Sequence, residues 1–305
     1  MFRRNKLYIS LEENCVRLLL GRGDGKRVFV EGFAALSLEE GLGRARDAGD
    51  LFAVGERIKN LAQEQGLSAK RYMVVLDRRG IVARTARVPV LKPRLLRDFL
   101  AREMGSLLPV DPDEYVSDYA VLKMVDEGDE GSYYQVFLAG VPRYMVEQVG
   151  IMAQAWDAYV EAVEVAPRSI LRLFRTSSWP DSVVLNLRAD GGFVMVIEKG
   201  GLLVHADLPF AGLDLVRPEE VAREVRGYLD FYSSRNQGKT IEQVWMAGQA
   251  GCDGEWVTRL AEFLPVPVEV LAGPAGLPVC SRRGKAGSQA VCTHAVLLGA
   301  LLRKG

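Results

Sequence analysis

The sequence lacks the charge excess that would point to nucleic acid. Its 305 residues carry 39 Lys and Arg against 39 Asp and Glu, so the formal net charge is zero. A general nucleic-acid binder needs a basic excess to displace counterions from the phosphates. We therefore expect no nucleic-acid partner.

Long apolar runs are also missing. No stretch approaches the roughly 20 apolar residues that a helix needs to cross a bilayer. The basic start is followed by an apolar run that ends at Leu11, which is too short for a secretory signal peptide. The run AVLLGALL near the C-terminus is short and predicts a buried helix. These absences predict a cytoplasmic protein.

Cysteine and histidine are too few and too scattered for a metal site. No C-x-x-C pair occurs, and the two histidines lie far apart, so we expect free thiols in a reducing compartment and no zinc. The residues concerned are Cys15, Cys252, Cys280, Cys292, His205 and His294.

What the sequence does contain is the same order of elements twice. Turn residues and apolar periodicity predict three strands, a helix and a strand in each half of the chain. In the first half these are 7–11, 16–21, 27–32, 51–62 and 72–76. In the second half they are 183–187, 192–198, 202–207, 218–233 and 243–246. Such repetition is typical of a duplicated α/β fold, whose halves usually leave a ligand cleft between them.

A further unit interrupts the first half. A strand at 80–88, a helix with an apolar face at 95–104, and strands at 114–124 and 132–140 form a strand–helix–strand–strand insert. A helix at 142–155 leads to a strand at 159–165 and a helix at 167–176. We divide the chain into a first half (1–79 and 158–178), an insert (80–157) and a second half (179–305).

The layout and several segments resemble the FtsA/PilM branch of the actin-like superfamily. GIVARTARVPVLKPRLLRDFLAREMGSLLPVDPDEYVSDYAVL and FLAGVPRYMVEQVGIMAQAWDAYVEAVEVAPRSILRLF resemble the PilM order around the insert. VAREVRGYLDFYSSRNQGKTIEQVWMAGQAG and QAVCTHAVLLGALLRKG resemble its later helix and strand and its final helix. The resemblance covers nearly the whole chain. It implies a duplicated actin-like (RNase H-like) fold with an SHS2-type insert, and with a reduced outer subdomain in the second half.

The resemblance also implies a function. PilM-like proteins are cytoplasmic scaffolds of type IV pilus platforms, which bind ATP between the halves and hold the N-terminal cytoplasmic peptide of a PilN-like membrane protein. We expect a cytoplasmic scaffold at the inner face of the membrane, attached through that partner, with other platform proteins and the assembly ATPase as further partners. On the insert helix, the apolar residues available to a partner are Leu96, Phe99, Leu100 and Met104, although most of them must cover the insert's own sheet.

The glycine loops that would hold phosphate have changed. Only glycine lets phosphates approach backbone N–H groups closely. Where the family has D-x-G this chain has Ser10-Leu11-Glu12, followed by Asn14, and in the second loop it has Asn186-Leu187-Arg188. The later glycine pairs become Ala211-Gly212 and Ala247-Gly248. A carboxylate at Glu12 would repel a triphosphate.

We therefore expect a degenerate cleft, with no cofactor and no ATP hydrolysis, and an ion pair between Glu12 and Arg188 across it. Two alternatives stay open. One is a functional ATP- and Mg-binding member whose nucleotide state controls partner binding. The other is a sugar-kinase-like phosphotransferase, although the required base Asp and glycine loops are absent at the aligned places.

Overall fold

The computed structural model describes residues 5–23, 28–45, 47–128, 131–174, 180–210, 212, 216–271, 279–281, 284–285 and 288–303. The first half contains β1 (Lys6–Leu11), β2 (Cys15–Gly23), β3 (Val28–Ser37), η1 (Leu42–Arg44), α1 (Ala48–Glu64), β4 (Arg71–Leu76), α3 (Arg143–Ala153), β8 (Tyr159–Val165) and α4 (Ala166–Leu173). The insert contains β5 (Val82–Pro89), α2 (Pro93–Leu107), β6 (Tyr115–Asp126) and β7 (Ser132–Pro142). Helix α3 falls within the range 80–157 that the sequence division gave to the insert, but it packs against α1 and is therefore described with the first half. The rest of the chain forms β9 (Ser182–Arg188), β10 (Gly191–Glu198), β11 (Gly201–Asp207), α5 (Pro218–Arg235), β12 (Gln243–Gly248), η4 (Ala250–Cys252), α6 (Gly254–Glu262), β13 (Val268–Val270), β14 (Val279–Ser281), β15 (Gly284–Lys285), α7 (Ser288–Thr293) and α8 (Ala295–Leu301).

The two halves share one sheet topology. In the first half the strands lie in the order β3-β2-β1-β4-β8, and in the second half in the order β11-β10-β9-β12-β13. In both, the first three strands are antiparallel and the next two run parallel to the first. The predicted duplication is therefore confirmed. The alternation and the hairpin glycines were enough to predict it, because register follows from which face of a strand is apolar.

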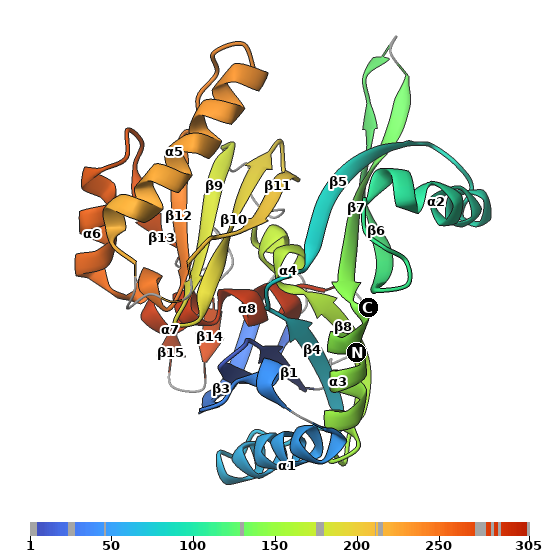
Figure 1. Ribbon diagram of the computed structural model, residues 1–305, viewed down its shortest axis with the longest axis vertical. Coiled ribbons are helices and arrows are strands. Elements are labelled where there is room, and N and C mark those ends of the chain that lie inside the picture. Colours follow the sequence, from blue (N-terminus) through green and yellow to red (C-terminus); the bar gives the residue numbers. More distant parts are fainter. Residues whose placement is uncertain are drawn as a thin grey trace.

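The insert has the predicted order β5-α2-β6-β7, and its three strands form a separate sheet in the order β5-β7-β6. One face of this sheet is covered by α2 (Figure 1). Strand β5 contacts β11 of the second half, where the Leu202 amide donates to the Thr85 hydroxyl at 3.1 Å. The Gly80 amide, at the start of the insert, donates to Asp207 at 2.8 Å. The insert therefore touches both halves.

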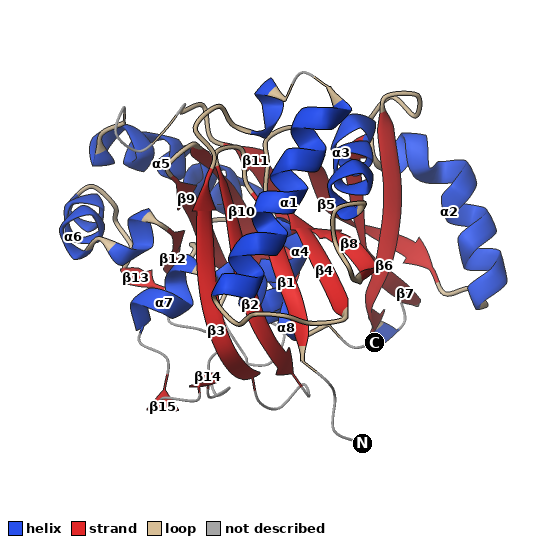
Figure 2. Cartoon of the chain, turned by 90° about the horizontal axis from the view of Figure 1, so that it is seen from below, coloured by secondary structure: helices blue, strands red, loops and turns tan. Residues whose placement is uncertain are grey.

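Helices cover both faces of the first sheet (Figure 2). Helices α1 and α3 pack together, and the backbone of α1 at Gly55 comes so close to α3 that a Cβ there would lie 2.4 Å from the Met152 carbonyl oxygen. Helices α4 and α8 pack against each other on the face toward the second half (Figure 1). The predicted buried helix at the C-terminal end is α8, and the described part of the chain contains no helix long and apolar enough to cross a membrane.

The C-terminal segment does not stay within the second half. Strand β14 pairs in parallel with β3, so that β14 and β15 extend the first sheet to seven strands. The sequence division assigned this segment to the second half because it follows that half along the chain. The boundary between 178 and 179 lies at residues 175–179, outside the described part, so the division itself stays a prediction.

Candidate functional site

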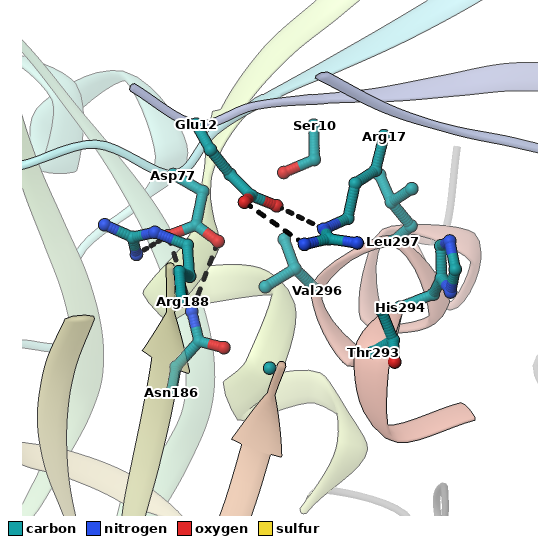
Figure 3. A pocket seen from close by; sticks show the side chains of 11 residues that line it. Ser10, Glu12, Arg17, Asp77, Asn186, Arg188, Thr293, His294, Val296 and Leu297 are labelled. Atoms are coloured by element: carbon teal, nitrogen blue, oxygen red, sulfur yellow. Dashed lines mark hydrogen bonds and ion pairs between the residues drawn. The ribbon is translucent and has the colours of Figure 1, made fainter. Parts of the chain in front are cut away.

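A small charged cleft lies between the halves, at the ends of β1, β4, β9 and β12 (Figure 3). Its free volume is only about 10 Å³, and α7 and α8 cover it with Thr293, His294, Val296 and Leu297. A cavity needs about 10–15 Å³ to hold one water molecule. The cleft therefore has no room for a nucleotide unless its lining residues move.

Arg188 joins the two halves of the cleft. Its Nη1 lies 2.5 Å from Oδ1 of Asp77, which follows β4 of the first half, and its Nε donates to Oδ1 of Asp190 at 2.9 Å. The Asn186 amide donates to Asp77 at 3.2 Å, and the Asn14 backbone amide donates to Asp190 at 3.0 Å. The Arg188, Asp77 and Asp190 side chains are each at most 4% exposed. The buried guanidinium of Arg188 is therefore bound by one carboxylate from each half, Asp77 from the first and Asp190 from the second.

A second ion pair lies beside the first. Glu12 accepts a hydrogen bond of 2.6 Å from Arg17 Nε on β2, and both side chains are largely buried. Together the cleft holds three carboxylates, on Glu12, Asp77 and Asp190, and two guanidinium groups, on Arg17 and Arg188. Each of the two guanidinium groups is already paired with a carboxyl group, so neither is left to bind a polyanionic ligand.

The expected ion pair between Glu12 and Arg188 is wrong in its partners. Arg188 binds Asp77 and Asp190, and Glu12 binds Arg17. Asp77 takes the place that the sequence interpretation gave to Glu12, because β4 ends directly opposite β9 across the cleft (Figure 3). An ion pair does connect the halves, but it is Asp77–Arg188.

Burial and neighbouring charges shift the pKa values of the cleft in opposite directions. Burial raises the pKa of Glu12 to about 7, although Arg17 opposes the rise. Burial also acts to raise the pKa of Asp190, but Arg188 and the Asn14 amide outweigh it and lower that pKa. Burial lowers the pKa of His294 to about 4, so this histidine is neutral above the cleft.

Glu12 should give the stability of the protein a measurable pH dependence. Its pKa is about 7 in the folded protein against an ordinary 4.5, so the folded state binds the proton more tightly than the unfolded state. The free energy of unfolding should therefore fall as the pH rises from about 4.5 to about 7. Urea unfolding of the wild type and of Glu12→Gln at about pH 5 and about pH 8 measures this.

In that experiment the free energy of unfolding of Glu12→Gln should fall less between the two pH values than that of the wild type. Glu56→Gln on the exposed surface of α1 should show the same decrease as the wild type. Identical pH dependence in the wild type and Glu12→Gln would show that Glu12 does not titrate in this range.

A much larger groove lies between the insert and the first half. Its volume is about 730 Å³, within the range of ligand-binding pockets. Its floor is the face of β6 and β7 that α2 does not cover, with Ala120, Phe137 and Ala139. Strand β8, helix α4 and the segment after α8 form the other wall. Val116, Val121 and Val163 line it and are 37–41% exposed, so apolar surface is open to solvent there.

Charged groups gather at the α4 end of this groove. Glu164 Oε2 lies 2.7 Å from Arg172 Nη2 and 3.7 Å from Arg303 Nη1. The guanidinium of Arg168 lies over the Phe137 ring, with 5.6 Å between its Cζ and the ring centroid. The groove thus combines an apolar floor with an arginine-rich end.

Comparison with known proteins gives matches to solved structures but to no family model and no curated protein. The structure titled "PilM-PilN type IV pilus biogenesis complex" matches with a TM-score of 0.78 and 19% identity, covering 97% of each chain. Ethanolamine utilization protein EutJ from Carboxydothermus hydrogenoformans matches with a TM-score of 0.56 and 13% identity, covering 99% of this chain and 90% of EutJ. A Bacteroides thetaiotaomicron protein with an actin-like ATPase fold matches with a TM-score of 0.51 and 11% identity, covering 99% of this chain and 96% of that one.

The chain has the actin-like ATPase fold. The expected actin-like fold is thereby confirmed, while the SHS2 type of the insert and the reduced outer subdomain stay predictions. The structure brings together the residues that the sequence interpretation placed in the cleft of this fold. Ser10, Glu12, Asn186, Arg188 and Gly248 line one cavity. The remaining two positions lie beside it, since Asn14 binds Asp190 and the Gly212 backbone is close to Ala189. The expectation that these residues bind no cofactor stays a prediction.

Gly248 has a backbone geometry that requires a glycine in this chain. Its φ is +80°, and a Cβ there would lie 2.3 Å from the Leu187 carbonyl oxygen. Strand β12 pairs with β9 at this point. The glycine is therefore explained by backbone packing, without any ligand.

The partner residues expected on α2 lie against the insert's own sheet. Leu96 and Leu100 are buried in the insert core, and Phe99 and Met104 pack against it. The groove lies on the opposite face of that sheet. These four residues hold the insert together, and the open apolar surface belongs to β6, β7 and β8.

Sequence reasoning missed Asp77, Arg17 and Asp190. Asp77 directly follows the apolar run YMVVL, and Asp190 lies in the turn after Arg188, so each stands at the end of a buried strand. A charged residue at the end of a buried strand of a duplicated fold marks the edge where the two halves meet. That position could have drawn attention to both aspartates.

Proposed function

We propose that the protein is a non-enzymatic cytoplasmic scaffold of a type IV pilus or related secretion platform. In this proposal it binds the N-terminal cytoplasmic segment of a PilN-like membrane protein, and thereby lies at the inner face of the membrane. The observation that carries the proposal is the open apolar groove between the insert and the first sheet. Similarity to a chain solved in a PilM–PilN complex supports the choice of partner.

Two features of the cleft support function without ATP hydrolysis. Its charged groups are already paired with one another, and its free volume of about 10 Å³ leaves no room for a nucleotide. A nucleotide would have to separate buried ion pairs, and separating such a pair costs several kcal/mol. We infer that the Asp77–Arg188 pair holds the halves together in place of Mg-ATP, while Arg17–Glu12 and Arg188–Asp190 keep the neighbouring charges paired within each half. Other platform proteins and the assembly ATPase are further proposed partners.

A binding measurement with a groove variant tests the scaffold proposal. A labelled peptide of the N-terminal segment of a PilN-like protein from the same organism is titrated with the wild type and with Val163→Glu. Val163 is 37% exposed in the groove, so the substitution puts a charge on the binding surface without burying it. We expect the dissociation constant to rise about tenfold or more, since a charge on a desolvated apolar contact costs at least about 1.4 kcal/mol.

The matched control is Leu95→Glu on the outer surface of α2, where the side chain is 54% exposed and outside the groove. It should bind the peptide as the wild type does. Absence of wild-type binding, or equal binding by Val163→Glu, would contradict the proposed function.

A further inference from the structure

The groove faces the hydrogen-bonding edge of a strand as well as side chains. Val163, Glu164 and Val165 are consecutive in β8, and all three line the groove. Successive side chains of a strand point to opposite faces of its sheet. A cavity that touches three in a row therefore lies along the edge of the strand, where the backbone N–H and C=O groups point. Four consecutive residues of the edge strand β6, Asp118 to Val121, also line the groove, so its edge faces the groove too. The register of β6 with β7 shifts directly after them, at Leu122, and such a bulge twists an edge away from a further strand, which favours β8.

This edge of β8 is open within the described part of the chain. Strand β8 is the last strand of the seven-stranded sheet and pairs with β4 on its other side. Such edges are usually protected by bulges or charges. In β8 the bulge lies before the groove, and the charged residue within it, Glu164, is paired with Arg172 of α4. The register with β4 shifts around Glu161, and Glu161 forms an ion pair with Lys6 at 2.5 Å.

We propose that the partner segment binds in the groove as an extended strand that pairs with the open edge of β8. This inference rests on the proposed function and specifies its binding mode. The segment adds an eighth strand to the sheet, and alternate apolar side chains lie on the floor formed by Ala120, Phe137 and Ala139. Backbone hydrogen bonds supply affinity, and the floor selects the side chains.

The charges of the groove add one requirement for the segment. Three arginines and two carboxylates line it, namely Arg168, Arg172, Arg303, Asp118 and Glu164, so the net charge is 3 − 2 = +1. The arginines all lie on the α4 side. A segment with an acidic group at this end would complement them. Arg303→Glu, whose side chain is 41% exposed, should weaken binding of such a segment more at low salt than at high salt.

Backbone N-methylation of the peptide tests the strand pairing. A set of peptides with the same sequence is made, each methylated at a single backbone nitrogen, and each is titrated with the whole protein. Because only every second amide of a strand faces a given neighbour, methylation should weaken binding about tenfold at alternate positions and little between them. Hydrogen exchange of the complex should show new protection in β8.

Each outcome bears on a different statement. If no peptide binds, the proposed function and this binding mode both fail. If the parent peptide binds but methylation has no two-residue period, or β6 gains protection while β8 does not, the proposed function stands and the pairing with β8 is wrong. Dimers in sedimentation without peptide, abolished by Val163→Glu, would assign the groove to a second copy of the chain and overturn the proposal.

Discussion

Replacing Arg188 by Ala should lower the free energy of unfolding by about 3–5 kcal/mol, because two buried carboxylates lose their cation. Asp77 is 3% exposed and lies 2.5 Å from the guanidinium, and Asp190 is 4% exposed and lies 2.9 Å away. Without Arg188 these groups either stay charged in a site of low polarity or take up protons. Both alternatives cost free energy. Because taking up a proton costs less at low pH, the loss of stability should be larger at high pH. Urea unfolding measures it.

Two controls separate this effect from the general cost of losing an arginine. Arg259→Ala removes an exposed arginine that lies 3.7 Å from Glu219, and should cost no more than about 1 kcal/mol. The double variant Arg188→Ala with Asp77→Asn should recover part of the loss, because one uncompensated charge is removed with its partner. If Arg188→Ala is as mild as Arg259→Ala, the buried ion pairs do not hold the halves together.

Adding one methyl group at Gly299 should destabilise the protein by about 1–3 kcal/mol through overpacking. A Cβ there would lie 2.0 Å from the Ser169 carbonyl oxygen, so α8 could no longer approach α4. Helix α8 covers the charged cleft, and the segment after it lines the groove. Gly299→Ala should therefore also weaken peptide binding, and thermal unfolding with peptide titration measures both effects.

Gly227→Ala on α5 is the matched control for this prediction. Nothing lies within 4 Å of a Cβ at that position, so alanine meets no obstacle. Since alanine favours a helix over glycine, this variant should be more stable by about 0.5–1 kcal/mol. The same Gly→Ala change would then lower the stability of the protein at position 299 and raise it at position 227. A stabilised Gly299→Ala would show that α4 and α8 are not in close contact.

The fold could be predicted because its determinants are local. Alternating apolar residues and hairpin glycines defined both three-stranded units, and Pro218 marked the start of α5. The short strands β13, β14 and β15 were missed because two or three residues carry no periodicity. The pairing of β14 with β3 was missed because it depends on tertiary packing across most of the chain.

The candidate sites were only partly predictable for the same reason. The positions of Glu12 and Arg188 near the cleft were implied by the resemblance to the two glycine loops of the family, but the choice of Asp77 as partner depends on how two strand ends meet. The groove could not be predicted, because three separate segments form it around Phe137, Val163 and Arg172. On α2 the apolar residues were recognised, and the structure shows that they cover the insert's own sheet.

In the proposed function, paired charges take the place of nucleotide in the cleft, while the groove binds the partner segment. Calorimetric titration of the wild type with Mg-ATP and with the PilN-like peptide, each with and without the other, tests both statements. We expect saturable binding of the peptide and no binding of Mg-ATP. The peptide should bind with the same affinity in the presence and in the absence of Mg-ATP. Saturable binding of Mg-ATP would contradict the account, as would a rise in stability, which amounts to about 2.7 kcal/mol at 100 times the dissociation constant.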